Sequence, residues 1–353
     1  MTSNNTTASR IPSEAVLRER FEQADYVAPD HVLTTTYVAL ALGRPLLVEG
    51  PPGSGKTELG KVLAESFDTE LIRLQCYEGL TAEHALYEWN YTKQLLAIQS
   101  DTGSVALEDG VSGSRTAAKA ETETETEADA EAETTDSPPT DDTTAHGPSV
   151  FDEQFLLERP LLRALRSAGD HPPVLLIDEI DRADAAFEAF LLELLSDFQV
   201  SIPELGTVKA TQPPIVILTS NRTRALSDAL KRRCVYLHVE PPAFETEYEI
   251  VRRKVPELDT AVAAAVCAVV ERLREESFLK EPGVSETLDW AQAVATLRTE
   301  GDDEPLTPTE IETTLGCLLK EVEDIHRVDA TLLETLHEAA AGAASRLEEA
   351  PPT

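Results

Sequence analysis

Residues 45–67 of this chain read PLLVEGPPGSGKTELGKVLAESF, and this stretch decides the fold. An apolar segment, 45–49, leads into a glycine-rich loop, and the loop leads into an amphipathic segment, 56–67. The loop matches the pattern GxxxxGK[ST], which between a strand and a helix forms a cradle of backbone N–H groups for phosphates. The alternative, a glycine-rich structural turn, rarely carries the whole pattern in this context. The stretch therefore predicts a nucleoside triphosphate site at the end of a buried strand.

The residues of this loop have separable expected roles. Lys56 would neutralise the β- and γ-phosphates, and the Thr57 hydroxyl would coordinate Mg²⁺. We therefore expect ATP and Mg²⁺ as cofactors. The expected nucleotide-binding residues are Gly50, Pro51, Pro52, Gly53, Ser54, Gly55, Lys56, Thr57 and Glu58.

A second apolar strand, expected over 173–178, ends in the adjacent carboxylates Asp178 and Glu179. Because parallel strands end at the same edge of a sheet, Asp178 would face the Mg²⁺ held by Thr57. Glu179 would then orient or deprotonate the attacking water. An acidic strand end that arose by chance is the alternative. The pair predicts a metal ligand next to a catalytic base.

Two further positions follow in the order that a hydrolytic site would need. Asn221 ends the expected strand 214–220 and could reach the γ-phosphate or the water, although Asn after a strand is often only a turn residue. Arg233, with Arg232 as second choice, lies in a basic helix end before the last strand. It could act on the nucleotide of a neighbouring subunit, or it could simply stabilise the helix dipole.

Short apolar strands alternate with amphipathic helices in the first two thirds of the chain, which predicts an α/β fold with an open parallel sheet. The expected strands are 45–49, 70–75, 173–178, 214–220 and 235–239, and the expected helices include 56–67, 155–167 and 185–198. Beyond residue 241 only helical periodicity remains. Helices are expected there near 244–255, 258–275, 285–299, 307–325 and 329–348.

The composition excludes several classes of protein. The 353 residues carry a formal net charge of −35, which disfavours a nucleic-acid-binding surface. So acidic a chain, with only nine Lys among 30 basic residues, is typical of a salt-accumulating microbe. Four cysteines without CxxC spacing argue against a disulfide scaffold or zinc site. Without a signal-like start or an apolar run of about 18 residues, we expect a cytoplasmic protein with no membrane insertion.

Residues 101–149 form an acidic, apolar-poor insertion with 13 acidic and two basic residues. Such a segment cannot bury enough apolar surface to offset its ordering entropy, so we expect it to be disordered. It is either a tolerated insertion or a regulatory or partner-binding segment.

The order of these motifs resembles that of the AAA+ ATPases, and within them the MoxR branch linked to carbon-monoxide dehydrogenase maturation. The sequence segments that show the resemblance lie within about residues 12–300. They include ALALGRPLLVEGPPGSGKTEL, LIRLQCYEGLTAEHALYEWNY, DEIDRADAAFEAFLLELLSDFQVSIPELG and ILTSNRTRALSDALKRRC. The resemblance implies a P-loop core with strand order 5-1-4-3-2 and a helical lid. We expect a disordered start 1–11, a core 12–240 containing the insertion 101–149, a separate helical lid domain 241–348 and a tail 349–353.

The same resemblance implies the working form and the roles of residues. A ring, a hexamer by analogy, would place Arg233 as the arginine finger and Asn221 as the polar sensor. Many relatives carry a sensing arginine at the start of a lid helix, but here 283–287 reads GVSET without one. Arg298 or another lid cation would have to substitute for it.

The function expected is an ATP-hydrolysing, chaperone-like remodelling factor. By analogy with the branch, it would act on a von Willebrand type A domain protein and assist metalloenzyme maturation or complex assembly. The alternative is a nucleotide-regulated protein-binding module with little turnover. The absent lid arginine favours this alternative, whereas the intact Asp178, Glu179 and Arg233 favour hydrolysis.

Overall fold

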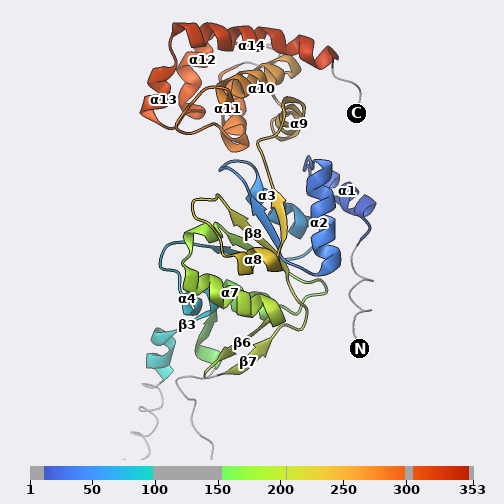
Figure 1. Cartoon of the computed structure of the whole chain (residues 1–353), viewed down its shortest axis with the longest axis vertical. Coiled ribbons are helices and arrows are strands. Elements are labelled where there is room, and N and C mark those ends of the chain that lie inside the picture. The colour runs from blue at the N-terminus through green and yellow to red at the C-terminus, as the bar shows by residue number, and fades with distance from the viewer. Residues whose placement is uncertain (1–11, 98–152, 204, 299–304, 350–353) are drawn as a thin grey trace, which may run out of the picture. The chain divides into compact units, whose positions relative to one another are not determined.

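The computed structural model describes residues 12–97, 153–203, 205–298 and 305–349 (Figure 1). The expected disordered start 1–11 and insertion 101–149 lie outside these residues, as do the last four residues of the expected tail. The chain divides into two compact units, Met1–Tyr87 with Glu158–Thr353, and Glu88–Leu157. Among the described residues, no helix has the length and apolar character needed to cross a membrane.

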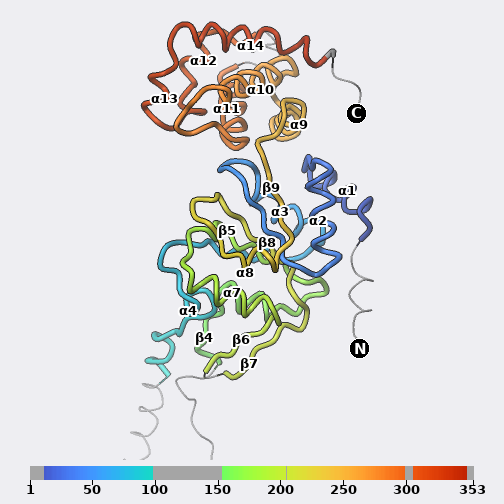
Figure 2. The backbone as a smooth tube through the Cα atoms, in the orientation of Figure 1, coloured from blue at the N-terminus to red at the C-terminus, as the bar shows by residue number. Residues whose placement is uncertain are grey.

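A five-stranded parallel sheet forms the centre of the first unit (Figure 2). Its strands are β1 (Leu46–Glu49), β2 (Leu71–Gln75), β5 (Val174–Asp178), β8 (Ile215–Ser220) and β9 (Val235–His238). They lie in the order β2-β5-β8-β1-β9, which, counted among these five alone, is the expected order 5-1-4-3-2. The predicted α/β fold class and strand order are therefore confirmed. Strands β1 and β5 are buried along their whole length, as their continuous apolar sequences require.

Helices cover both faces of the sheet (Figure 1). Helices α1 (Glu14–Gln23), α2 (Asp30–Leu42) and α3 (Lys56–Ser66) share a hydrophobic core with one face. Other helices before residue 240 include α4 (Ala82–Leu86), α6 (Pro160–Arg166), α7 (Ala185–Asp197) and α8 (Asp228–Arg233), with the short turn η2 (Ile180–Arg182) after β5. Helices α1, α2 and α4 lacked a sequence prediction, although Ser13 caps α1 and Gly43 ends α2 with φ 59°.

The helix expected over 155–167 is wrong in its first part. Its start forms the turn η1 (Glu153–Phe155) and the strand β4 (Leu156–Glu158), which pairs with β3 (Tyr87–Trp89). The helix α6 begins only at Pro160, because a proline fits the first helical turn but forces its predecessor into extended backbone. A hairpin of β6 (Gln199–Ile202) and β7 (Gly206–Lys209) was not predicted.

The C-terminal part is helical and has its own hydrophobic core. Its elements are α9 (Phe244–Lys254), α10 (Thr260–Arg274), α11 (Val284–Leu297), α12 (Pro308–Thr314), η3 (Leu315–Cys317), α13 (Val322–Arg327) and α14 (Ala330–Glu349). The single helix expected over 307–325 is wrong, because three short elements replace it. The Thr314 hydroxyl bonds back to the Glu310 carbonyl at 2.6 Å, and Gly316 follows, so the helix ends there.

A buried ion pair ties three of these helices together. The Arg274 guanidinium of α10 donates to both carboxylate oxygens of Glu247 in α9, at 2.6 and 2.7 Å. The Thr287 hydroxyl of α11 donates to the same carboxylate at 2.7 Å. Because the Glu247 side chain is 0% exposed, its charge depends on these donors. The network fixes α11, whose first residues lie at the glycine-rich loop.

We expect Arg274→Ala to destabilise the fold by about 3–5 kcal/mol, because it leaves a buried carboxylate without its cation. Arg253→Ala is the matched control, since Arg253 pairs with Glu249 on the same α9 at partly exposed positions. That control should cost less than about 1 kcal/mol. Denaturant unfolding in molar KCl measures both. Equal losses in the two variants would contradict the assigned role of Arg274.

Candidate functional site

The glycine-rich loop lies between the end of β1 and the start of α3, where the sequence places it. Gly53 and Gly55 adopt φ values of 77° and 85°, which residues with a Cβ rarely adopt. Gly55 is the N-cap of α3, so the unpaired N–H groups and the positive end of that helix lie at the loop. This geometry provides a site for phosphate oxygens.

Lys56 is buried and lies folded along the same loop. Its ammonium group donates to the carbonyl oxygens of Gly50 at 3.0 Å and Pro51 at 2.6 Å. Burial lowers the pKa of Lys56, against the opposing effect of Asp178, Asp181 and Glu179. The ammonium is thus held by neutral carbonyls, which an anion of higher charge can replace.

Asp178 ends β5 next to the first turn of α3, as predicted. The Thr57 hydroxyl donates to its carboxylate at 3.1 Å, and the Thr219 hydroxyl donates to the same oxygen, Oδ1. The other oxygen, Oδ2, accepts from the Arg73 guanidinium at 2.5 and 3.1 Å. The carboxylate, with its side chain 4% exposed, is therefore held by two hydroxyls and one cation.

Glu179 follows in left-handed backbone, with φ 55°, and its backbone N–H donates to the Thr219 hydroxyl at 2.9 Å. Its carboxylate pairs with Arg182 at 2.7 Å and accepts from the Asn221 amide at 3.3 Å. A non-glycine residue in this conformation is strained, and such strain is common at functional sites. The structure thus brings Glu179 and Asn221 together from neighbouring strands.

Asp181, a residue that the sequence reasoning missed, fixes the loop that carries Asn221. Its carboxylate accepts from the Asn221 N–H at 3.2 Å and from the Thr223 N–H and hydroxyl at 2.9 and 2.6 Å. Burial alone would raise the pKa of Asp181, but the bonds from Thr223 and Asn221 outweigh it and lower that pKa. In the sequence, Asp181 could have been found as the third acidic residue of the segment DEID, residues 178–181.

Arg73 and Arg182 were also missed, since no motif in the chain marks them as partners of the two acids. Arg73 lies on β2, which is the neighbour of β5, and Arg182 lies one 3₁₀ turn after Glu179. Only the order of the strands brings Arg73 to Asp178. In the described part of the chain, each carboxylate of the adjacent pair thus has an arginine partner.

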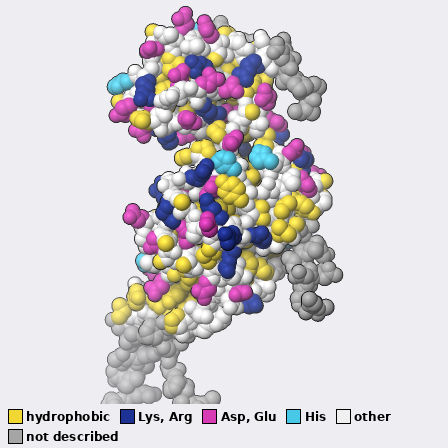
Figure 3. Space-filling view, in the orientation of Figure 1, with side chains coloured by type: hydrophobic (Ala, Val, Ile, Leu, Met, Phe, Trp, Pro, Cys, Tyr) yellow, Lys and Arg dark blue, Asp and Glu magenta, His cyan; other side chains and the backbone are white. Residues whose placement is uncertain are grey.

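The basic end of α8 holds Lys231, Arg232 and Arg233, and Figure 3 shows Lys and Arg side chains gathered in this region. The Arg233 guanidinium donates to the Leu192 carbonyl and the Ser196 hydroxyl of α7 in the same chain. Arg44 donates to the carbonyls at the helix end, including that of Arg233 at 3.0 Å. These contacts hold Arg233 against α7 within one chain, and a role across subunits is a proposal.

The first residues of α11 meet the phosphate loop without an arginine. The Val284 N–H donates to the Gly53 carbonyl at 2.9 Å. A Cβ on Gly283 would lie 2.8 Å from the Gly53 Cα, so the two backbones touch. Arg298 instead donates to Glu310 within the helical part, at 3.0 Å from both its Nε and Nη2. Glu58, at the start of α3, pairs with Lys61 at 2.8 Å.

These residues fit a nucleotide with Mg²⁺. The Thr57 hydroxyl and Asp178 carboxylate are hard oxygen donors that converge within 3.1 Å, which suits Mg²⁺. The loop offers N–H donors and Lys56 to the phosphates.

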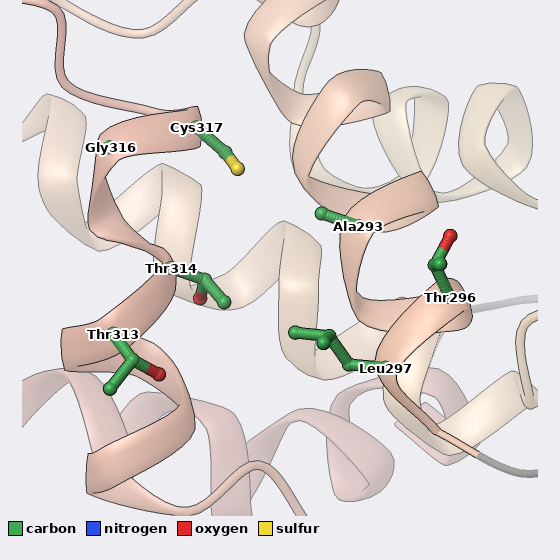
Figure 4. Close-up of a pocket in the computed structure, with 7 residues that line it drawn as sticks. All are labelled: Ala293, Thr296, Leu297, Thr313, Thr314, Gly316 and Cys317. Atoms are coloured by element: carbon green, nitrogen blue, oxygen red, sulfur yellow. The ribbon is translucent and has the colours of Figure 1, made fainter.

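Elsewhere, a hollow of about 360 Å³ is lined by Ala293, Thr296, Leu297, Thr313, Thr314, Gly316 and Cys317 (Figure 4). Among the described residues that line it, Cys317 is the one titratable group.

One comparison with known proteins assigns a family. The family model described as AAA ATPase domain matches residues 31–207, half of the chain. Protein YojN of Bacillus subtilis (strain 168), itself uncharacterized, is 35% identical over 94 residues, which are 26% of this chain and 28% of that protein. The chain thus aligns with well under a third of this relative's length.

Solved structures of the Thermotoga maritima RuvB protein resemble the chain only distantly. One mutant of that protein gives a TM-score of 0.42 at 16% identity, over 98% of this chain and 86% of that chain. The structure described as the RuvB Holliday junction branch migration motor gives 0.40 at 17% identity, over 96% and 82%. The assignment therefore depends on the family match, the strand order and the loop geometry. On these grounds, the chain belongs to the AAA ATPase domain family.

Proposed function

We propose that this chain hydrolyses ATP at the carboxyl edge of its sheet. The observation that carries the proposal is the meeting of Glu179 and Asn221, whose side chains lie 3.3 Å apart beside the Thr57–Asp178 pair. A base and a polar sensor next to a metal-binding pair are the parts that hydrolysis of a phosphoanhydride needs. A site that only bound nucleotide would have no need of the base.

Each side chain has a defined task in this proposal. Lys56 leaves its loop carbonyls and neutralises the β- and γ-phosphates. Thr57 and Asp178 would hold Mg²⁺, which supplies positive charge to the phosphate oxygens. Glu179 accepts a proton from the attacking water, and Asn221 orients that water or the γ-phosphate. Glu179 must first exchange its bond with Arg182 for one with the water.

The finer proposal is a MoxR-type, chaperone-like remodelling factor in the cytoplasm of a salt-accumulating microbe. It would assemble into a ring, a hexamer by analogy, and act on a protein partner such as a von Willebrand type A domain protein. The net charge of −35 supports a protein partner over a nucleic acid, because it repels phosphate backbones. The sequence segments within residues 12–300 that resemble the MoxR branch support this finer assignment.

A second candidate is a nucleotide-regulated binding module with little turnover. The observation that favours it is the ion pair of the Glu179 carboxylate with Arg182 at 2.7 Å, which occupies the group that hydrolysis needs. Turnover would then depend on whether a partner displaces Arg182 from this carboxylate. Substitutions at Glu179 and Arg233 separate the two candidates.

Glu179→Gln keeps the size of the side chain and removes its basicity. ATP binding should survive, while turnover should fall at least ~10²-fold. Glu193→Gln, an exposed position on α7, is the matched control and should match the parent. Phosphate release and nucleotide affinity are measured side by side in molar KCl. Parental turnover in Glu179→Gln would exclude Glu179 as the base.

Arg233→Ala tests whether the site is completed between subunits. Nucleotide affinity should stay near that of the parent, because Lys56 and the loop remain, whereas turnover should fall ~10³-fold. In rings that mix Arg233→Ala with Glu179→Gln subunits, some interfaces pair an intact Glu179 with an intact Arg233. Turnover should recover at those interfaces. Verified mixed rings without recovery would reject the shared site and favour the binding module.

A further inference from the structure

Arg73 makes a contact that the hydrolytic scheme does not use. Its Nη2 and Nε atoms lie 2.5 and 3.1 Å from Asp178 Oδ2, and Nη2 also donates to the Gln75 side chain at 2.8 Å. Both Arg73 and Gln75 are exposed residues of β2, two positions apart, so they share one face of the strand. The guanidinium therefore bridges β2 to the metal-binding acid of β5.

The two oxygens of Asp178 are engaged differently. Oδ1 accepts from the hydroxyls of Thr57 and Thr219, which are neutral groups. Oδ2 lies 3.3 Å from the Thr57 hydroxyl and forms an ion pair with the Arg73 guanidinium at 2.5 Å. A cation bound between Thr57 and Asp178 would need an oxygen from the same carboxylate. The guanidinium and such a cation would then share one buried negative charge.

The burial of the two partners differs in a way that allows exchange. The Asp178 side chain is 4% exposed, whereas that of Arg73 is 51% exposed. The carboxylate cannot turn to water, so it needs a cation or several donors at all times. The arginine can swing into solvent at little cost, because most of its hydration is already available there.

We propose that Arg73 and Mg²⁺ are alternative partners of Asp178, so that Arg73 lowers the affinity of the site for the metal. The proposal rests on the proposed function, because it assigns Asp178 to Mg²⁺. Arg73 neutralises the buried acid until the metal arrives with the nucleotide, and it then turns away from Oδ2. Two cations held by the same buried carboxylate repel each other strongly.

The test is a Mg²⁺ titration of the full chain at constant ionic strength, with a fluorescent ADP analogue as the probe. Arg73→Ala should lower the Mg²⁺ concentration that gives half-maximal ADP binding by about fivefold, the scale of a half-exposed ion pair. Arg73→Gln keeps a hydrogen bond but no charge, and it should shift the midpoint in the same direction. In excess EDTA, where no Mg²⁺ is available, the ADP affinity of both variants should equal that of the parent.

Arg163→Ala is the matched control, since Arg163 pairs with Glu70 at an exposed position near the start of β2. It should leave the midpoint unchanged. A midpoint that is unchanged or raised in both Arg73 variants would overturn the proposal. Lower midpoints in a chain that never releases phosphate from ATP would reject hydrolysis and keep the role of Arg73. A parent that binds no ADP at any Mg²⁺ concentration would overturn both.

Discussion

The charge of Asp178, buried at the end of a wholly buried strand, must be met by a cation or by several hydrogen-bond donors. Its partners come from three separate elements: Thr57 on α3, Thr219 on β8 and Arg73 on β2. A parallel sheet with β5 between β2 and β8 is the arrangement that brings these elements to one carboxylate. The need to compensate the charge of Asp178 is therefore met by the same strand order that brings the site residues to one edge of the sheet.

Similar local compensation applies to the other charged groups of this edge. Lys56 lies against loop carbonyls, Glu179 lies against Arg182 and Asn221, and Arg233 lies against α7. Each contact satisfies a charge within one chain. In the proposed function, the phosphates of ATP would replace the loop carbonyls at Lys56, water would replace Arg182 at Glu179, and the nucleotide of a neighbouring subunit would replace α7 at Arg233. The backbone contact between Gly53 and Val284 offers the helical part a direct connection to the loop, although residues 283–287 include no arginine.

The sequence was sufficient for residues that a motif defines. The loop around Lys56 and the acids at the end of β5 could be placed, because their spacing and apolar flanks determine which edge they occupy. Arg73 could not be placed, since its partner is 105 positions away and is found only once β2 and β5 are neighbours. The start of α6 was predicted wrongly, although Pro160 indicates that a helix begins there. The helix over 307–325 was also predicted wrongly, although Gly316 indicates a break within it.

The central claim is Mg²⁺-dependent hydrolysis of ATP at the Lys56 loop, and phosphate release by the purified full chain in molar KCl tests it most directly. The parent and Lys61→Ala, which alters an exposed lysine further along the same α3, should both release phosphate only with Mg²⁺. Lys56→Ala should lose nucleotide binding and release together. A parent that binds ATP but releases no phosphate, or a Lys56→Ala variant as active as the parent, would contradict the account.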